Sequence, residues 1–194
     1  AAANFPDFAN SKENIARDLA LAKDAGFTDI VVDVRPTTGD VLFKTNIVDQ
    51  VKFMYAWIGS NYTKVERTAT WDYLQAFVDE ARKQGLRIHA AINTFVGGNQ
   101  IDGGTGLLYR DQSKAEWATQ MNMQTGIVSV MNTSESTKFF NPAHPEVQTF
   151  LCDLLKDLAS YDLDGIFLDR GRFLNLQTDF SEESRKQFEE YMGG

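Results

Sequence analysis

One pattern occurs three times along the chain: an amphipathic helix, a short turn, an apolar strand and then a loop. The copies span Lys12–Arg35, Trp71–Asn93 and Pro145–Asp169. Helices that alternate with short apolar strands are typical of an α/β fold with a buried parallel sheet. Parallel neighbouring strands have their carboxyl ends at one edge of the sheet, so we expect the residues that end these strands to lie close together.

The predicted helices begin at residues that suit a helix amino terminus. These residues are Ser11, Thr70, Pro145 and, for a further helix that runs to about Tyr191, Ser181. Outside the copies, the sequence indicates a short extended piece at 41–45 and a hairpin strand at 126–130, and it leaves 46–68 undecided. The connection 94–141 is long and rich in glycine, and such lengths usually serve a function.

Composition limits the class of protein. A chain of 194 residues, 43% of them hydrophobic, suits one core, and we expect 1–194 to be a single domain. The net charge of −8 argues against a nucleic-acid partner, because phosphates need basic surfaces. No apolar run approaches the roughly 20 residues of a membrane span. The first residues have neither the basic nor the apolar region of a signal peptide, so none is visible.

The end of the third strand is the most informative position for function. The apolar run Gly165–Leu168 is followed directly by Asp169. Barrel enzymes keep catalytic groups at the carboxyl ends of their strands, which makes Asp169 the candidate catalytic residue. Further candidates for substrate contacts lie in or just after the three strands; these are Asp33, Arg35, His89, Asn93, Arg170 and Arg172.

Four stretches of the sequence resemble a known family. They are Gly26–Pro36, Gly85–Asn93, Asn141–Val147 and Tyr161–Asp169. Together they are similar to the glycosyl-hydrolase-like family-10 proteins, which are bacterial (β/α)8-barrel proteins distantly related to the α-amylases. The resemblance implies a partial TIM barrel, roughly strands 1–4 with their helices and a long insertion after strand 3. It also implies a periplasmic or secreted glycosidase that acts on a poly- or oligosaccharide and needs no cofactor.

By this resemblance Asp169 ends the fourth barrel strand, where amylase-like enzymes place the nucleophile of a retaining reaction. Arg170 or Arg172 would then favour its charged form. The general acid should come from a later strand that this chain does not contain, and Asp33 is a less suitable substitute. Phe5 would follow a remnant of the first strand. The run Arg170–Phe173 departs from the family, whose members often carry another Asp or an aromatic pair there.

Each candidate also has a structural alternative. Asp169 suits a salt bridge or a helix cap, Asp33 and Arg35 suit an internal ion pair, and His89 suits a hydrogen-bonded core position. Asn93 is the better sugar ligand, because an amide both donates and accepts hydrogen bonds. Rings in predicted loops suit either sugar stacking or packing; these are Trp57, Tyr109 and Trp117.

Two other functions compete with hydrolysis. The chain could be a carbohydrate-binding barrel without catalysis, or an assembly module whose open sheet edges pair with another chain. The sequence leaves the oligomeric state open. A metal is not expected, because the two histidines, His89 and His144, lack ligand spacing.

Overall fold

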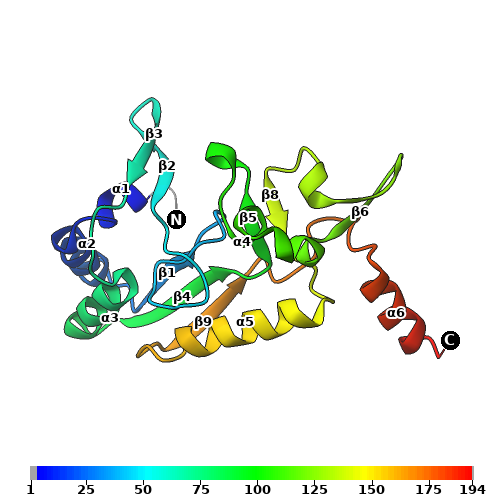
Figure 1. Ribbon diagram of the computed structural model, residues 1–194. Helices are drawn as coiled ribbons and strands as arrows, with labels where there is room; N and C mark the ends of the chain where they lie inside the picture. The colour runs from blue at the N-terminus through cyan, green and yellow to red at the C-terminus, as the bar shows by residue number, and fades with distance from the viewer. Residues whose placement is uncertain (1–3, 194) are drawn as a thin grey trace. The chain divides into compact units, whose positions relative to one another are not determined.

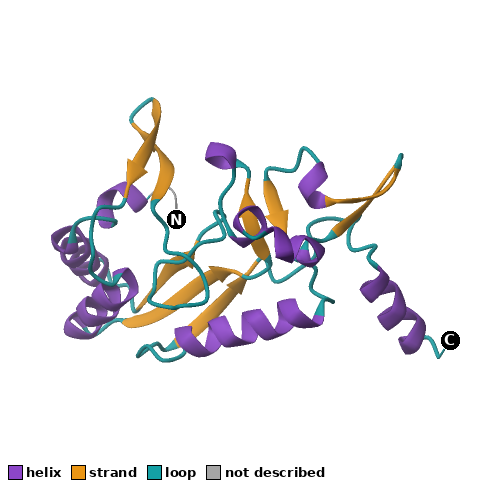
Figure 2. Cartoon of the chain, in the orientation of Figure 1, coloured by secondary structure: helices purple, strands orange, loops and turns teal. Residues whose placement is uncertain are grey.

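The computed structural model describes residues 4–193, and its helices and strands alternate as an α/β chain (Figure 2). The chain forms two compact units. The first contains the residues up to Pro36, Val41–Ile92 and Asp157–Phe167; the second contains Thr37–Asp40, Asn93–Lys156 and the residues from Leu168 onward. Each segment of the second unit therefore begins close to the carboxyl end of one of the three predicted strands.

A three-stranded sheet has the order β1-β4-β9 (Figure 1). Its strands are β1 (Asp29–Arg35), β4 (Arg87–Asn93) and β9 (Gly165–Asp169). β1 and β4 pair in parallel, from Asp29 opposite Arg87 to Arg35 opposite Ile92. The three predicted strands are thus confirmed, each within two residues of its expected start.

Helices α2 (Lys12–Asp24) and α3 (Tyr73–Gln84) contact each other in the first unit. The Ser11 side chain accepts a hydrogen bond from the Asn14 amide at 3.1 Å, which confirms the predicted cap of α2. The predicted cap of α3 at Thr70 is wrong. Asp72 is the cap, because its carboxylate accepts from the third amide of the helix, that of Gln75.

The core of the first unit lies between these helices and one face of β1. Val32 is 5% exposed on the helix side, whereas Val31 is 59% exposed on the other. Short helix α1 (Phe5–Phe8) adds the Phe8 ring, whose centroid lies 5.4 Å from that of Phe77. The remnant of a first strand expected before Phe5 falls on the first residues of the chain, which lie outside the described residues.

An antiparallel hairpin occupies most of the undecided segment. It consists of β2 (Phe53–Ile58) and β3 (Asn61–Glu66), joined at Gly59 and Ser60. A Gly-Ser pair between two runs rich in aromatic and β-branched residues is a hairpin signal, so this sequence contained the information. The extended piece predicted at 41–45 is wrong, since only a single bridge from Val41 to Gln50 forms there.

The second unit contains two small sheets, helices of different lengths and the last residues of β4 and β9. β6 and β7 form the predicted hairpin, and β5 pairs with β8. Ser181 caps the last helix as predicted, by accepting from the Ser184 amide. The remaining bounds are β5 Val96–Asn99, β6 Gln120–Met123, β7 Gly126–Ser129, β8 Thr137–Phe139, α4 Leu107–Arg110, α5 Pro145–Leu158, α6 Glu182–Tyr191 and the 3₁₀ turns Ile101–Gly103, Gln112–Trp117 and Val130–Asn132.

Glycines allow the loop after β1 to pack against the long connection within the second unit. A Cβ atom on Gly39 would lie 3.1 Å from the backbone of Gly97 and of Gly98. One on Gly106 would lie 2.5 Å from the Gly97 carbonyl oxygen. Real Cβ atoms seldom come as close as 3.1 Å and essentially never as close as 2.5 Å, so the glycine-rich sequence of this region reflects close approach of main chains.

We predict that Gly97→Ala lowers the free energy of unfolding by about 2–3 kcal/mol, because an added methyl group overpacks the interior. Its Cβ would lie 2.5 Å from Leu108 Cδ1 and 2.8 Å from Phe140 Cε1. The matched control is Gly171→Ala, whose Cβ would meet its nearest atom at 3.4 Å. Urea denaturation measures both variants, and equal stabilities would contradict the close packing.

Candidate functional site

Asp169 is the last residue of β9 and is exposed. Its Oδ1 accepts a hydrogen bond from the Arg170 amide at 2.7 Å, and its carbonyl oxygen accepts from the Thr94 amide at 2.8 Å. No hydrogen bond engages Oδ2 within residues 4–193. The main chain thus holds the carboxylate at the strand end and leaves one of its oxygens open to solvent.

Neither of the two arginines after Asp169 forms an ion pair with it in the described part of the chain. Arg172 Nη1 instead donates to the carbonyl oxygens of Phe173 and Leu174, at 3.0 and 2.8 Å. Arg170 has a φ of +48°, which is uncommon for a residue with a side chain. The role expected of Arg170 or Arg172, an opposite charge that favours the charged form of Asp169, stays a prediction.

Asn93 ends β4, and its side chain is buried. The next residue, Thr94, makes the amide contact to the Asp169 carbonyl oxygen. Within the second unit, the ends of β4 and β9 are therefore neighbours. Asn93 therefore directly precedes the residue whose amide binds Asp169, and it stays a candidate for a substrate contact.

Asp33 and Arg35 lie at the end of β1, in the first unit. The pairing with β4 shifts by one residue between them, which is a β-bulge, and bulges re-aim side chains at the ends of strands. Asp33 Oδ1 accepts from the Arg35 amide at 3.2 Å. The Arg35 side chain is fully buried, which favours the structural alternative for this residue over a substrate contact.

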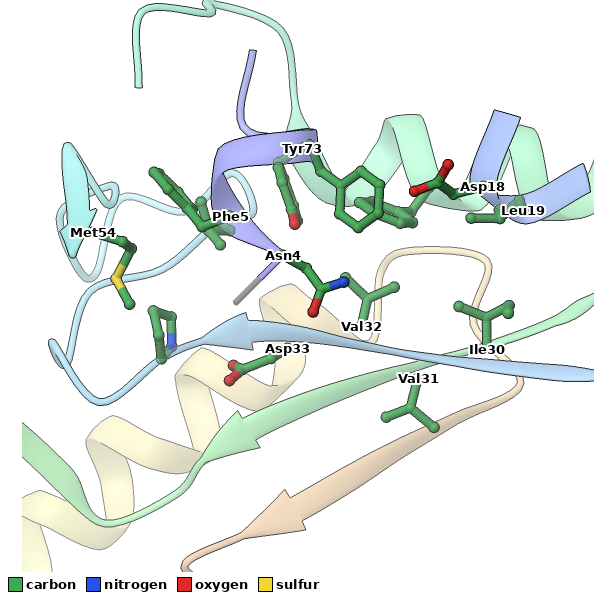
Figure 3. A pocket seen from close by; sticks show the side chains of 14 residues that line it. Asn4, Phe5, Asp18, Leu19, Ile30, Val31, Val32, Asp33, Met54 and Tyr73 are labelled. Atoms are coloured by element: carbon green, nitrogen blue, oxygen red, sulfur yellow. The ribbon is translucent and has the colours of Figure 1, made fainter. Parts of the chain in front are cut away.

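A pocket of about 300 Å³ lies along the edge of β1 that faces away from β4. Figure 3 shows Val32 on the side of Tyr73 and Phe5, with Val31 and Asp33 on the opposite side of the strand. Burial and the nearby Asp33 carboxylate raise the pKa of Tyr73. Because residues from both faces of β1 line it, the pocket follows the strand's free edge.

His89 has a structural partner. Its Nε2 lies 2.9 Å from Asp29 Oδ1, and Arg87 donates two hydrogen bonds to the same carboxylate at 2.8 and 2.7 Å. Asp29 and Arg87 begin their strands, so this cluster lies toward the amino ends of β1 and β4. These hydrogen bonds favour the structural alternative for His89 over a substrate contact.

A buried carboxylate that was not singled out in the sequence follows β1. Asp40 is 7% exposed, and both of its oxygens accept from Arg110 of α4, with Nη1 to Oδ2 at 3.2 Å. The sequence signal that could have indicated Asp40 is the turn at 37–40, because Gly-Asp after the end of a strand is typical of a polar loop. This ion pair connects the loop after β1 to α4 within the second unit.

Of the three aromatic residues considered for sugar stacking, only Trp57 exposes most of its side chain, at 67%. Trp117 is 5% exposed, and its Nε1 donates to Glu146 at 3.1 Å. The stacking alternative is therefore wrong for Trp117. Tyr109 packs on Gly104, where an added Cβ would meet the ring at 2.2 Å.

No three His, Cys, Asp or Glu side chains within residues 4–193 are placed to hold a metal ion. None of the helices described is both long and apolar enough to cross a membrane.

Comparison with known proteins identifies the family. The sequence model described as glycosyl hydrolase-like 10 matches residues 2–193, which confirms the resemblance seen in the sequence. An S-layer-related protein of Niallia circulans is 30% identical over 198 residues. That alignment covers 99% of this chain and 12% of the relative, so the chain spans about an eighth of the relative's length.

Solved structures share the fold at low sequence identity. Alpha-L-fucosidase isoenzyme 2 from Paenibacillus thiaminolyticus aligns with a TM-score of 0.61 and 19% identity, over 96% of this chain and 24% of the fucosidase. A hypothetical protein from Ruminiclostridium thermocellum aligns at 0.59 and 15%, over 96% and 86%. Isomaltulose synthase from Klebsiella sp. aligns at 0.55 and 14%, over 95% and 36%.

We predict an acid-dependent stability contribution from Asp29. Hydrogen bonds from Arg87, Thr28 and His89 hold the pKa of the Asp29 carboxyl well below its usual range. Because the pKa of Asp29 is lower in the folded than in the unfolded protein, the ionised carboxylate stabilises the fold fully above the unfolded-state pKa of about 4. This stabilisation is lost as the pH falls below that pKa. The gap in urea midpoint between wild type and Asp29→Asn should therefore shrink from pH 5 to pH 3. A gap that stays constant would contradict the assignment.

Proposed function

The chain belongs to the glycosyl hydrolase-like 10 family, and we propose that it supplies the nucleophile and part of the substrate site of a retaining glycoside hydrolase. The observation that carries the proposal is the position of Asp169. Asp169 is exposed and ends a strand of the sheet; among residues 4–193 its carboxylate accepts a hydrogen bond only from the Arg170 amide, and its carbonyl oxygen accepts one from the Thr94 amide. Strand ends of this kind carry the catalytic groups of barrel enzymes.

In a retaining reaction two carboxyl groups act in turn. An Asp169 oxygen would attack the anomeric carbon and form a glycosyl ester, while an acid protonates the departing glycosidic oxygen. Water, deprotonated by the same second group, would then cleave the ester and release Asp169 as a carboxylate. The open Oδ2 suits the attack, and the hydrogen bond from the Arg170 amide stabilises the negative charge of the free carboxylate.

The second carboxyl group would come from a part of the barrel outside these 194 residues. Support for such a barrel comes from the sheet edges, since β1 and β9 each pair on one side only among residues 4–193. The pocket along the free edge of β1 leaves room for a neighbouring strand there. A full barrel has eight strands and about 250 residues, so we propose that β1, β4 and β9 are its second, third and fourth strands.

The proposed place of action is outside the cytoplasm. The S-layer-related name of the Niallia circulans relative supports a secreted or surface protein, and cell-surface polysaccharides would then be accessible substrates. Because that relative is named for the S-layer and not for an enzyme activity, a second candidate function is that the domain binds carbohydrate without cleaving it. The two candidates differ in what Asp169 does, because only hydrolysis needs its nucleophilic oxygen.

The test is Asp169→Asn in the full-length protein, assayed for release of reducing ends from a panel of polysaccharides. We expect turnover to fall by at least about a thousandfold, because the nucleophile is removed. Asp153→Asn on α5 is the matched control, since this half-exposed carboxylate forms an ion pair only with Lys156 among residues 4–193, and surface pairs contribute little.

A second variant separates a nucleophile from a positioning residue. With Asp169→Gly and added azide, a retaining enzyme should regain turnover on an activated aryl glycoside and form a glycosyl azide. Near-wild-type turnover in Asp169→Asn would overturn the nucleophile. Wild-type protein that binds a polysaccharide of the panel but hydrolyses none would favour the binding candidate.

A further inference from the structure

The hairpin β2–β3 has two unlike faces. Met54 and Ala56 point to one face and are buried, at 7% and 2% exposure. The alternate positions Phe53, Tyr55 and Trp57 are aromatic and point to the other face. The buried face anchors the hairpin on the first unit, so the aromatic face is turned away from that core.

Four rings form a continuous row on the aromatic face, which we call the aromatic ladder: Phe53, Tyr55, Tyr62 and Trp57. Successive ring centroids are 6.1, 5.3 and 5.3 Å apart. Tyr62 lies directly opposite Trp57 across the hairpin and stacks on Tyr55 with an interplanar angle of 27°. The contacts hold the rings in place before any ligand arrives, which lowers the entropic cost of binding.

The outer part of the ladder is open to solvent. Trp57 is 67% exposed and Tyr62, directly opposite it, is 56% exposed. Two exposed rings in contact mark an interaction site more often than a single exposed ring does. Apart from Trp57, which the sequence already offered for sugar stacking, no residue considered above for catalysis or substrate contact lies on the hairpin.

We propose that the aromatic ladder is a binding platform for a neutral polysaccharide chain. Pyranose rings present flat C–H faces that stack on aromatic rings, and a row of rings suits successive sugars of an extended chain. The tyrosine hydroxyls at the ring edges would meet sugar hydroxyls. The net charge of −8 disfavours an acidic polymer, which is why the platform fits a neutral one.

The inference rests on the carbohydrate part of the proposed function and is independent of the role of Asp169. A polysaccharide offers many sugars that can stack on the ladder, whereas a small aryl glycoside offers one. The platform should therefore matter for the binding of long substrates and not for the turnover of a small aryl glycoside.

The experiment is affinity electrophoresis of the chain in gels that contain neutral polysaccharides (xylan, mixed-linkage β-glucan, mannan or starch) or the acidic polygalacturonate. Asp169→Asn is the background, so that hydrolysis does not remove the ligand. We expect retardation by at least one neutral polymer, and a drop in affinity of at least about tenfold in Trp57→Ala/Tyr62→Ala.

The matched control is Phe188→Ala/Tyr191→Ala on α6, which removes two aromatic rings that are 63% and 86% exposed. This variant should leave the retardation unchanged.

A second readout is the tryptophan fluorescence of the protein. Trp57→Phe keeps a ring in the ladder, so it should retain binding but lose the change in tryptophan emission that the polymer causes in the wild type.

Four results would overturn the platform. They are no retardation by any neutral polymer, equal retardation of the Trp57→Ala/Tyr62→Ala variant, stronger retardation by polygalacturonate, and self-association that the same variant abolishes. The last result would mean that the ladder covers a second copy of the chain. None of them bears on the nucleophile, because loss of turnover in Asp169→Asn is measured separately.

Discussion

The main-chain pairing of the parallel sheet determines where the candidate residues lie. Pairing of β1 with β4 aligns Asp29 with Arg87 at one end and Arg35 with Ile92 at the other. The Thr94 amide then joins the end of β4 to Asp169 at the end of β9. A one-residue shift in any of these pairings would turn each side chain to the opposite face. The register therefore determines which side chains of β1 and β4 gather around Asp29, and the Thr94 contact determines which strand end lies beside Asp169.

The sequence predicted the parts of the fold that depend on local patterns. The apolar runs of β1, β4 and β9 and the Ser11 and Ser181 caps were found, because burial and capping leave a clear mark on nearby residues. The hairpin β2–β3 was missed, although its Gly-Ser turn was visible. Met54 and Ala56 alternate with aromatic residues in β2, so this strand lacks the alternation of apolar and polar residues that usually marks a half-buried strand.

Side-chain partners in the candidate site were harder to predict than strand positions. Arg170 and Arg172 follow Asp169 in the sequence, and opposite charges that are close in sequence favour the idea of an ion pair. The chain turns instead, with Arg170 at positive φ, and Arg172 caps the carbonyl groups of the next residues. The partner of Asp40, which is Arg110, lies 70 residues away, and no local pattern reveals such a pair.

The nucleophile and the aromatic ladder would contribute to hydrolysis in different ways. Asp169 is held by short main-chain contacts, and in the proposed reaction this would serve the attacking oxygen, which must be placed accurately. Stacking of a sugar on Trp57 or Tyr62 tolerates sliding, since a ring face has no single contact point. A polysaccharide chain that the ladder holds loosely can therefore move until one of its glycosidic bonds meets the carboxylate, and the two sites need not be held in one fixed geometry.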